Sequence, residues 1–358
     1  MKIKEILETM DFGKSPESPE QALAWIDKHG GKMSMYVNGK PHQPSECEFF
    51  ESRNPANGQL LAQIPQATQV EVDFAVQAAR KAQPKWENLG GTERAKYLYA
   101  LARLIQKHSK LFAVLESMDN GKTIRESRDV DLPLVIRHFY YHAGSAQLME
   151  KEMPDHQAVG VAGQIIPWNF PLLMLAWKIA PALLMGNTVI AKPSEITPLT
   201  AHFLGKVCVK IGLPAGVLNI VHGYGPEVGQ AIVEHPEIKA ISFTGGTSTG
   251  KIVAATAAPM FKKLSLELGG KNASIVLEDA DLEIAVPGVL RSSFLNSGQI
   301  CLCGSRVLVH SSIFDEFMDK YLQQLKEFSI GPVISEQHRS KVLSYIELAI
   351  QEGGQILA

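Results

Sequence analysis

Two hydrophobic patterns follow one another along the chain and predict different elements. Before Pro154, apolar residues recur at helical spacing and predict four helices, at residues 68–82, 92–108, 111–120 and 131–148. After Pro154, short apolar runs alternate with helical segments and predict four strands, at residues 160–166, 188–191, 217–221 and 240–243. Such alternation predicts an α/β fold in which a parallel sheet is connected by crossover helices.

A second set of elements follows from Lys263. Its predicted strands are residues 264–268, 273–277 and 306–310, and its predicted helices are residues 282–294 and 313–328. Paired glycines at 269–270 suggest a domain boundary there. A chain of 358 residues exceeds what one hydrophobic core usually serves, so two domains are expected.

Turn signals and one apolar stretch complete the outline. Asn38-Gly39 predicts a tight hairpin, and a second turn at residues 54–58 precedes a predicted strand at 60–64. The most apolar stretch, residues 171–186, contains Lys178 and Pro181 and falls short of the roughly 20 residues that cross a bilayer. It therefore predicts a buried helix and no membrane span.

The first 33 residues form an N-terminal helical extension. Ile3, Ile6, Leu7 and Met10 give one helical pattern, and residues 22–26 give another after a Ser-Pro linker. Charged residues interrupt the first pattern, so it is not a signal peptide. We interpret the extension as a docking arm without chemistry of its own.

Charge and cysteine content narrow the partners and the compartment. The chain has 35 Lys plus Arg against 37 Asp plus Glu, a net charge of -2, and no long run of one sign, so nucleic acid and acidic membranes are not expected partners. Four cysteines in a chain of this length do not form a disulfide framework. A reducing, cytoplasmic location is expected.

A cysteine stretch at residues 293–304 carries the first candidate chemistry. It places Cys301 in a loop with Gly298 and Gly304, whose backbone freedom allows a sharp turn beside the sulfur. A thiolate in this setting would be a nucleophile, and a cysteine that only packs is the alternative. Cys303 is expected in the same extended segment, pointing in the same general direction as Cys301.

Three further patterns have both a catalytic and an ordinary interpretation. Glu267 is either a base that takes a proton from water or a solvated strand end. Asn169 is either a hydrogen-bond donor to an oxyanion or a cap for the helix that begins near Pro171. The glycines of residues 243–250 fit either a pyrophosphate-binding turn or an ordinary strand-to-helix turn.

Four motifs then occur in one order: residues 166–171 (IPWNFP), 191–195 (AKPSE), 264–271 (LSLELGGK) and 293–304 (SFLNSGQICLCG). With them the chain resembles the NAD(P)-dependent aldehyde dehydrogenases, from about Tyr36 to its last residue. The N-terminal extension resembles the long members that carry two copies of the fold, family sixteen of that superfamily. The resemblance implies a Rossmann-type parallel-sheet NAD-binding domain at residues 34–269, with an oligomerisation hairpin at 145–159, and a partial α/β catalytic domain at 270–358.

The resemblance also implies a mechanism and its residues. Cys301 is the nucleophile, Asn169 and the N–H of the cysteine hold the oxyanion, and Glu267 activates water. The aldehyde is oxidised to a carboxylic acid through a thiohemiacetal and a thioester. Glu195 near the ribose 2'-hydroxyl favours NAD over NADP. The implied cofactor contacts are Ile165, Ile166, Pro167, Trp168, Lys192, Ser194, Glu195, Gly225, Gly229, Phe243, Thr244, Gly245, Gly246, Thr249, Gly250, Leu268 and Gly269.

No metal is expected, because the His and Tyr cluster at residues 138–142 has no carboxylate at ligand spacing. Two departures from the family pattern stand out. A surface segment between Phe328 and Gly331 is shorter than in the family, and the chain stops at Ala358 before the family's Glu-x-Phe-Gly-Pro motif. We therefore expect a C-terminally truncated, poorly active piece of a homo-oligomeric enzyme, and a non-catalytic binding or scaffold module is the alternative.

Overall fold

The computed structural model describes residues 17–358. Its strands are β1 (Met35–Val37), β2 (Lys40–His42), β3 (Phe49–Arg53), β4 (Leu60–Pro65), β5 (Val161–Ile165), β6 (Thr188–Lys192), β7 (Leu218–Ile220), β8 (Ile238–Thr244), β9 (Lys263–Glu267), β10 (Ala273–Val276) and β11 (Arg306–Val309). Its α-helices are α2 (Glu20–Asp27), α3 (Gln69–Asn88), α4 (Gly90–Lys107), α5 (Ser109–Asn120), α6 (Ile124–Glu126), α7 (Leu132–Glu152), α8 (Pro171–Leu184), α9 (Leu199–Lys210), α10 (Gln230–Glu234), α11 (Thr247–Ala257), α12 (Leu282–Phe294), α13 (Phe314–Leu325) and α14 (Glu336–Gln351).

A seven-stranded sheet forms the centre of the larger unit, with the strand order β2-β1-β7-β6-β5-β8-β9. Strands β7, β6, β5, β8 and β9 are mutually parallel, as crossover helices require, and β1 and β2 add an antiparallel hairpin at one edge. Asn38 and Gly39 turn this hairpin with φ angles of 53° and 74°. The predicted parallel sheet and hairpin are confirmed.

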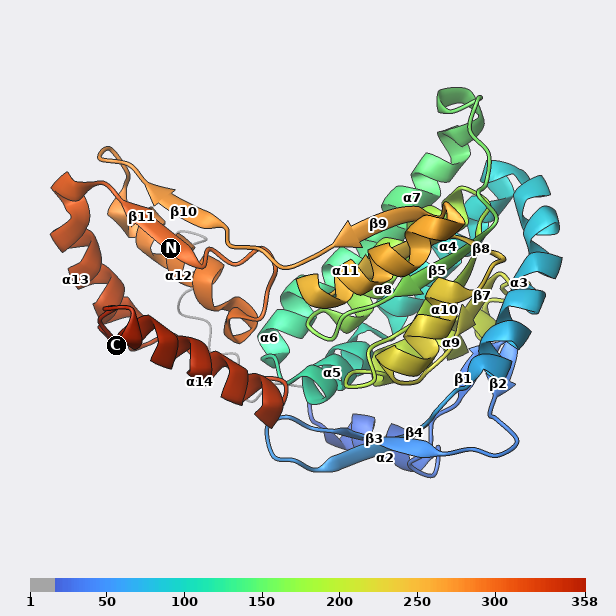
Figure 1. Ribbon diagram of the computed structural model, residues 1–358, viewed down its shortest axis with the longest axis horizontal. Helices are drawn as coiled ribbons and strands as arrows, with labels where there is room; N and C mark the ends of the chain where they lie inside the picture. The colour runs from blue at the N-terminus through green and yellow to red at the C-terminus, as the bar shows by residue number, and fades with distance from the viewer. Residues whose placement is uncertain (1–16) are drawn as a thin grey trace, which may run out of the picture.

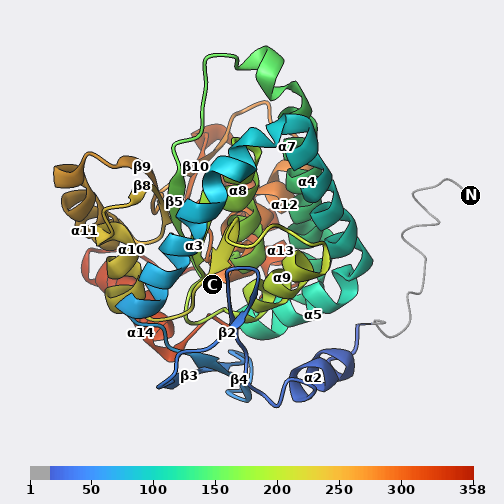
Figure 2. The same cartoon turned by 90° about the vertical axis from the view of Figure 1, so that its right-hand side faces the viewer.

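Helices cover both faces of this sheet (Figures 1 and 2). On one face, α4, α5, α7, α8 and α9 share an apolar core that includes Leu98, Phe139 and Leu175. On the other face, α3, α10 and α11 pack a second core around Val72 and Ile232. Burial of α8 explains why its sequence is apolar nearly throughout.

A smaller unit lies beside the larger one and contains β10, β11, α12 and α13 (Figure 1). Its two strands are parallel, and a separate core around Val286 and Phe317 holds the helices on them. The expected boundary at 269–270 falls in the connection between β9 and β10. The predicted strand at 264–268 was wrongly grouped with the second set, because β9 pairs with β8 in the large sheet.

The structure differs from the sequence prediction between α7 and β5. The hairpin expected at residues 145–159 does not form, because α7 continues to Glu152 and residues 153–160 have no strand. In the N-terminal extension, α2 packs Ala22 and Ile26 into the first core, whereas the helical pattern at residues 3–10 lies outside the described residues.

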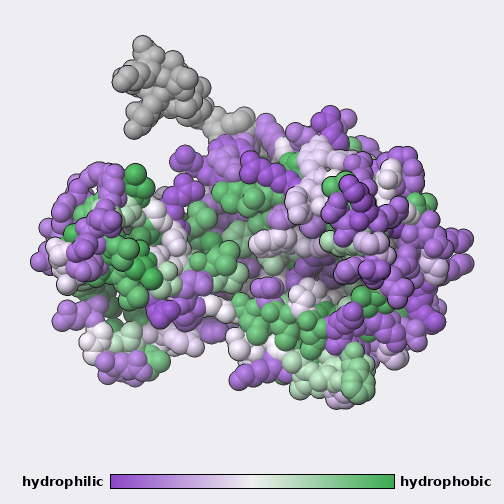
Figure 3. Space-filling model, turned by 90° about the horizontal axis from the view of Figure 1, so that it is seen from above, coloured by the Kyte–Doolittle hydropathy of each residue, from purple (hydrophilic) through white to green (hydrophobic). Residues whose placement is uncertain are grey.

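Apolar side chains stay exposed on the smaller unit, at the left of Figure 3, including Ile275, Leu277 and Leu308.

Candidate active site

The three candidate catalytic residues come from three separate segments and line adjoining cavities. Cys301 lies between α12 and β11 in the smaller unit, Glu267 ends β9, and Asn169 lies in the loop between β5 and α8. A cavity of about 490 Å³ is lined by Cys301 and Glu267, and one of about 290 Å³ is lined by Cys301 and Asn169. The thiol is therefore at the junction of both cavities.

Cys301 is presented by a sharply wound segment after α12. Asn296, Ser297 and Gly298 have φ angles of 50°, 56° and 74°, three left-handed residues in succession. The expected extended segment at Cys301–Cys303 is wrong: residues 301–302 form a turn, in which the Cys303 N–H donates to the carbonyl of Ile300 at 3.2 Å. The turn buries Cys303 and leaves Cys301 half-buried at the cavity, because the alternation of an extended strand does not apply.

Asn169 does not cap α8. Its side-chain Nδ2 donates to the backbone carbonyl of Gln299 at 2.9 Å, and no side chain caps the helix at Phe170. A side-chain amide has two N–H groups, so this bond fixes the direction of the amide and leaves one N–H free to donate. The bond also joins the Asn169 loop to the turn that carries Cys301.

The loop after β9 contacts the backbone of Cys301. Asn272 Nδ2 donates to the carbonyl oxygen of Cys301 at 2.7 Å. A Cβ at Gly270 would lie only 2.5 Å from the same oxygen, so only glycine fits at this position. The paired glycines that follow Glu267 thus allow the strand end and the thiol turn to approach each other.

Lys178 is a charged residue that sequence reasoning treated only as a break in an apolar helix. Its Nζ donates to Ser242 Oγ at 2.8 Å, and it lines the same cavity as Glu267 and Cys301. Burial lowers the pKa of Lys178 to about 8, against the opposing effect of the Glu267 carboxylate. The signal available in the sequence was a lysine inside an otherwise apolar helix.

A third cavity, of about 500 Å³, lies at the carboxyl ends of β5, β6 and β8. This is the usual place for a ligand in an open parallel sheet. Fourteen of the expected cofactor contacts line it: Ile165, Ile166, Pro167, Trp168, Lys192, Ser194, Glu195, Gly225, Gly229, Phe243, Thr244, Gly245, Gly246 and Thr249. Sequence reasoning did not include Pro226, Gln230, Val233, Ile252 and Val253, which also line it.

The other three expected contacts lie elsewhere. Leu268 and Gly269 line the smaller cavity beside Asn169. Gly250 faces Leu268, whose Cδ2 would be 2.5 Å from an added Cβ, so any larger residue would displace the Leu268 side chain on the loop after β9. Its position in the glycine turn therefore has a structural explanation that needs no direct contact with a ligand.

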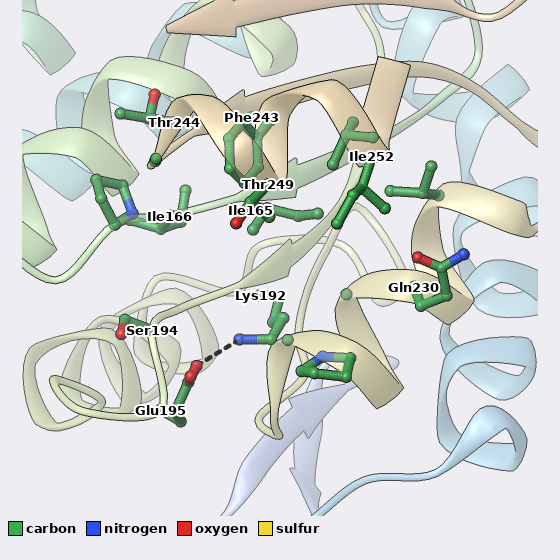
Figure 4. A pocket seen from close by; sticks show the side chains of 18 of the residues that line it. Ile165, Ile166, Lys192, Ser194, Glu195, Gln230, Phe243, Thr244, Thr249 and Ile252 are labelled. Carbon is green, nitrogen blue, oxygen red and sulfur yellow. Dashed lines mark hydrogen bonds and ion pairs between the residues drawn. The ribbon is translucent and has the colours of Figure 1, made fainter. Parts of the chain in front are cut away.

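The polar groups of the third cavity suit an anionic nucleotide. The backbone N–H groups at the start of α11 follow Gly246, which has room for a ligand to approach. Lys192 is 2% exposed, and its Nζ donates to Glu195 Oε2 at 3.0 Å (Figure 4). Burial lowers the pKa of Lys192, and Glu195 opposes this effect. An ammonium, a carboxylate and a helix N-terminus thus face one space.

The three cavities share walls. Thr244, at the end of β8, lines all of them, and its buried Oγ1 has no hydrogen-bond partner. Trp168 lies between the third cavity and the smaller one, and His338 of α14 packs edge-on against its ring at 5.0 Å. A ligand in the third cavity can therefore extend past Thr244 to the thiol of Cys301.

Two kinds of feature are absent from residues 17–358. There is no group of three or more His, Cys, Asp or Glu side chains that could hold a metal ion. Nor does any helix in this part of the chain have the length and apolar character needed to cross a membrane.

Comparison with known proteins gives a consistent result. A family model described as "Aldehyde dehydrogenase family" matches residues 42–358. The chain is 44% identical to a human 2-aminomuconic semialdehyde dehydrogenase, over 90% of this chain and 70% of the relative. It is 41% identical to a 2-hydroxymuconic semialdehyde dehydrogenase from a Pseudomonas species, over 91% of this chain and 72% of the relative. An NAD+ complex of a Bacillus cereus aldehyde dehydrogenase has a TM-score of 0.89 at 37% identity and covers 98% of this chain and 74% of that one.

Proposed function

The chain belongs to the aldehyde dehydrogenase family, and on this premise we propose that it oxidises an aldehyde to a carboxylic acid by cysteine chemistry with NAD. The observation that carries the proposal is the position of Cys301, which lines one cavity with Glu267 and another with Asn169. Both cavities share Thr244 with the space that suits a nucleotide. A nucleophile, a base, an oxyanion donor and a cofactor space are therefore contiguous.

Attack by the thiolate is the first step. Cys301 Sγ forms a bond to the carbonyl carbon, and the electrons of the C=O bond move to oxygen. The free N–H of the Asn169 amide and the backbone N–H of Cys301 donate to this developing oxyanion. A donor of this kind lowers the barrier by roughly 3 to 4 kcal/mol in well-studied enzymes.

NAD, when bound, supplies the hydride acceptor. In this proposal, Lys192 and Glu195 would bind the adenosine ribose, and the backbone N–H groups at the start of α11 would bind the pyrophosphate. When hydride leaves the thiohemiacetal carbon, the C=O bond re-forms and the substrate is held on Cys301 as a thioester.

Hydrolysis completes the cycle. Glu267 takes a proton from a water molecule whose oxygen attacks the thioester carbon. The C–S bond then breaks, the acid leaves, and the sulfur returns as a thiolate. The presence of Glu267 favours hydrolysis over acyl transfer to coenzyme A.

The amount of NADH that each variant forms tests these roles. The Cys301→Ala variant should form no NADH from an aldehyde. The Glu267→Gln variant should form about one equivalent of NADH per chain and then stop, because the thioester forms but is not hydrolysed. Turnover by Cys301→Ala at the wild-type rate would refute the proposal.

Alkylation by iodoacetamide tests the alternative of a non-catalytic binding module. Burial raises the pKa of the thiols of Cys47, Cys208 and Cys303, that of Cys208 to about 12, so all three should react slowly. Cys301 should be labelled first in a mass-spectrometric time course near neutral pH. Equal rates at all four cysteines would favour the module without catalysis.

We also propose a cytoplasmic homo-oligomer. All four cysteines are free thiols, which fits a reducing compartment. Phe261 is 94% exposed in a left-handed turn that directly follows exposed Met260, and a second copy would cover these two side chains. Sedimentation analysis of the wild type beside Phe261→Ser would show whether this surface is an interface.

A further inference from the structure

A fully buried lysine lies beneath the loop that carries Asn169. Lys122 follows the left-handed cap of α5 at Gly121, and its side chain is 0% exposed. Its Nζ is 2.7 Å from Asp131 Oδ2, donates to the backbone carbonyl of Asn169 at 3.0 Å, and lies 4.1 Å from the centre of the Phe170 ring. Two of its three contacts are thus with residues of the Asn169 loop.

The carbonyl of Asn169 also receives a donor from the turn that carries Cys301. Asn296 Nδ2 donates to it at 2.9 Å, and the N–H of Asn296 donates to Glu126 Oε1. Asn120 Nδ2 donates to the preceding carbonyl, that of Trp168, at 2.8 Å and to the Asn169 carbonyl at 3.5 Å. Residues 120–131 therefore hydrogen-bond both the Asn169 loop and the turn that carries Cys301.

Stability alone is a weak explanation for this buried charge. Removing an ammonium and a carboxylate from water is costly, and apolar residues of similar size often replace such a pair without loss of stability. The C-terminal end of α5 does not use the ammonium: the N–H of Gly121 caps it by donating to the carbonyl of Ser117 at 2.9 Å, and Lys122 Nζ bonds Asp131 and Asn169 and no carbonyl of α5. What an apolar replacement could not supply is a directed bond to the Asn169 carbonyl.

We propose that Lys122, held by Asp131, is a positioning residue that sets the Asn169 amide against Cys301. By fixing the Asn169 backbone, it directs the amide N–H that is not bonded to Gln299 toward the oxygen of the attacked carbonyl. Lys122 does not touch the substrate and acts through Asn169. The inference rests on the proposed function, in which Cys301 attacks a carbonyl.

Two reagents separate positioning from general damage. Reaction of Cys301 with p-nitrophenyl acetate passes through an oxyanion: Sγ bonds to the carbonyl carbon, and p-nitrophenolate leaves with the electron pair of the broken C–O bond. Alkylation by iodoacetamide breaks a carbon–iodine bond and forms no oxyanion. The ratio of the two rate constants for Cys301 therefore measures the oxyanion donors alone.

In the full chain, Lys122→Met should slow acylation by p-nitrophenyl acetate about 10-fold to 100-fold, since a misplacement near 1 Å costs about 100-fold. Its rate with iodoacetamide should stay within about 2-fold of wild type. Asn169→Ala should show the same selectivity. Because Lys122 acts through Asn169, the Lys122→Met/Asn169→Ala double variant should be no slower than Asn169→Ala alone.

A matched control and a second variant keep the result interpretable. Lys262 is another buried lysine whose Nζ donates to two backbone carbonyls, those of Val233 and His235, away from the thiol. Lys262→Met should leave the ratio of rate constants unchanged. If Lys122→Met folds poorly because Asp131 is left unpaired, Lys122→Met/Asp131→Asn removes both charges together and should lower the ratio equally.

The outcomes are distinct. Equal slowing of Cys301 with both reagents would overturn the positioning role. So would a Lys122→Met/Asn169→Ala double variant whose acylation rate falls by the product of the two single losses. A wild-type chain that is acylated at Cys301 but forms no NADH from any aldehyde would instead refute the proposed function, and the ratio would still report on Lys122.

Discussion

Gly270→Ala should impair the chemistry of Cys301 far more than it impairs folding. The new Cβ would be 2.5 Å from the carbonyl oxygen of Cys301, whereas real Cβ contacts essentially never fall below 3.0 Å and ordinarily begin at 3.4 Å. Either the thiol turn or the loop after β9 must therefore move by about 0.5 to 0.9 Å. Either movement changes the position of Cys301 relative to Glu267, which is only three residues before Gly270.

The size of the effect follows from that displacement. At about 100-fold per 1 Å, the shift predicts a loss of about 10-fold to 60-fold in kcat, or about 1.4 to 2.4 kcal/mol of transition-state stabilisation. The KM for NAD should change little, because the cavity at the ends of β5, β6 and β8 does not include Gly270. Thermal unfolding should shift by only a few degrees, since exposed loops can absorb the movement.

Steady-state NADH formation and a thermal melt of the same preparation would measure both effects. The control is Gly288→Ala. Gly288 is an exposed residue in the middle of α12, where an added Cβ meets nothing within 4 Å. That substitution should leave kcat unchanged and can stabilise the helix by up to about 1 kcal/mol. A Gly270→Ala enzyme with kcat within about 2-fold of wild type would refute the reasoning from the close contact.

Two further predictions concern cofactor choice and pH. Glu195→Gln should improve NADP binding relative to NAD, because it removes the half-buried carboxylate that would repel a 2'-phosphate; calorimetric titration of both cofactors measures the ratio, and an unchanged ratio would contradict the role of Glu195. Burial raises the pKa of Asp119 to about 8 from an ordinary value of 3.8, so the stability that its bound proton supplies is complete below about pH 4 and is lost as the pH rises through about 8. In Asp119→Asn, which can keep its bonds to Leu199 and Ser52, the urea midpoint should fall less between pH 5.5 and 8.5 than in wild type; an equal fall in both proteins would assign the effect to other groups.

Local patterns predicted most of the fold correctly. The limits of α12 agree with the sequence pattern, and the parallel strands lie within a few residues of their expected positions. One failure depended on a contact between distant segments. Strand β9 has the apolar pattern of either unit, and only its pairing with β8 assigns it to the larger sheet. The hairpin at residues 145–159 was implied by the resemblance, whereas residues 147–152 are good helix formers and α7 continues to Glu152.

The candidate site shows the same division. Motifs identified Cys301, Glu267 and Asn169, but whether Asn169 capped a helix or donated elsewhere depended on Gln299, which is 130 residues away. Lys122 and Asn296 were missed because each meets Asn169 only after folding. The resemblance of the extension to two-copy enzymes stays a prediction, as do the roles of the expected site residues and the domain limits.

The proposed chemistry is divided between the two units. Cys301 belongs to the smaller unit, whereas Asn169 and Glu267 belong to the larger one, so the reactive centre exists only where the two surfaces meet. In evolutionary terms, neither half can acquire or keep the activity by itself. A substitution in one unit that alters the contact between the two units can be tolerated only if the other unit accommodates it. Selection on the activity therefore acts on the interface between the units.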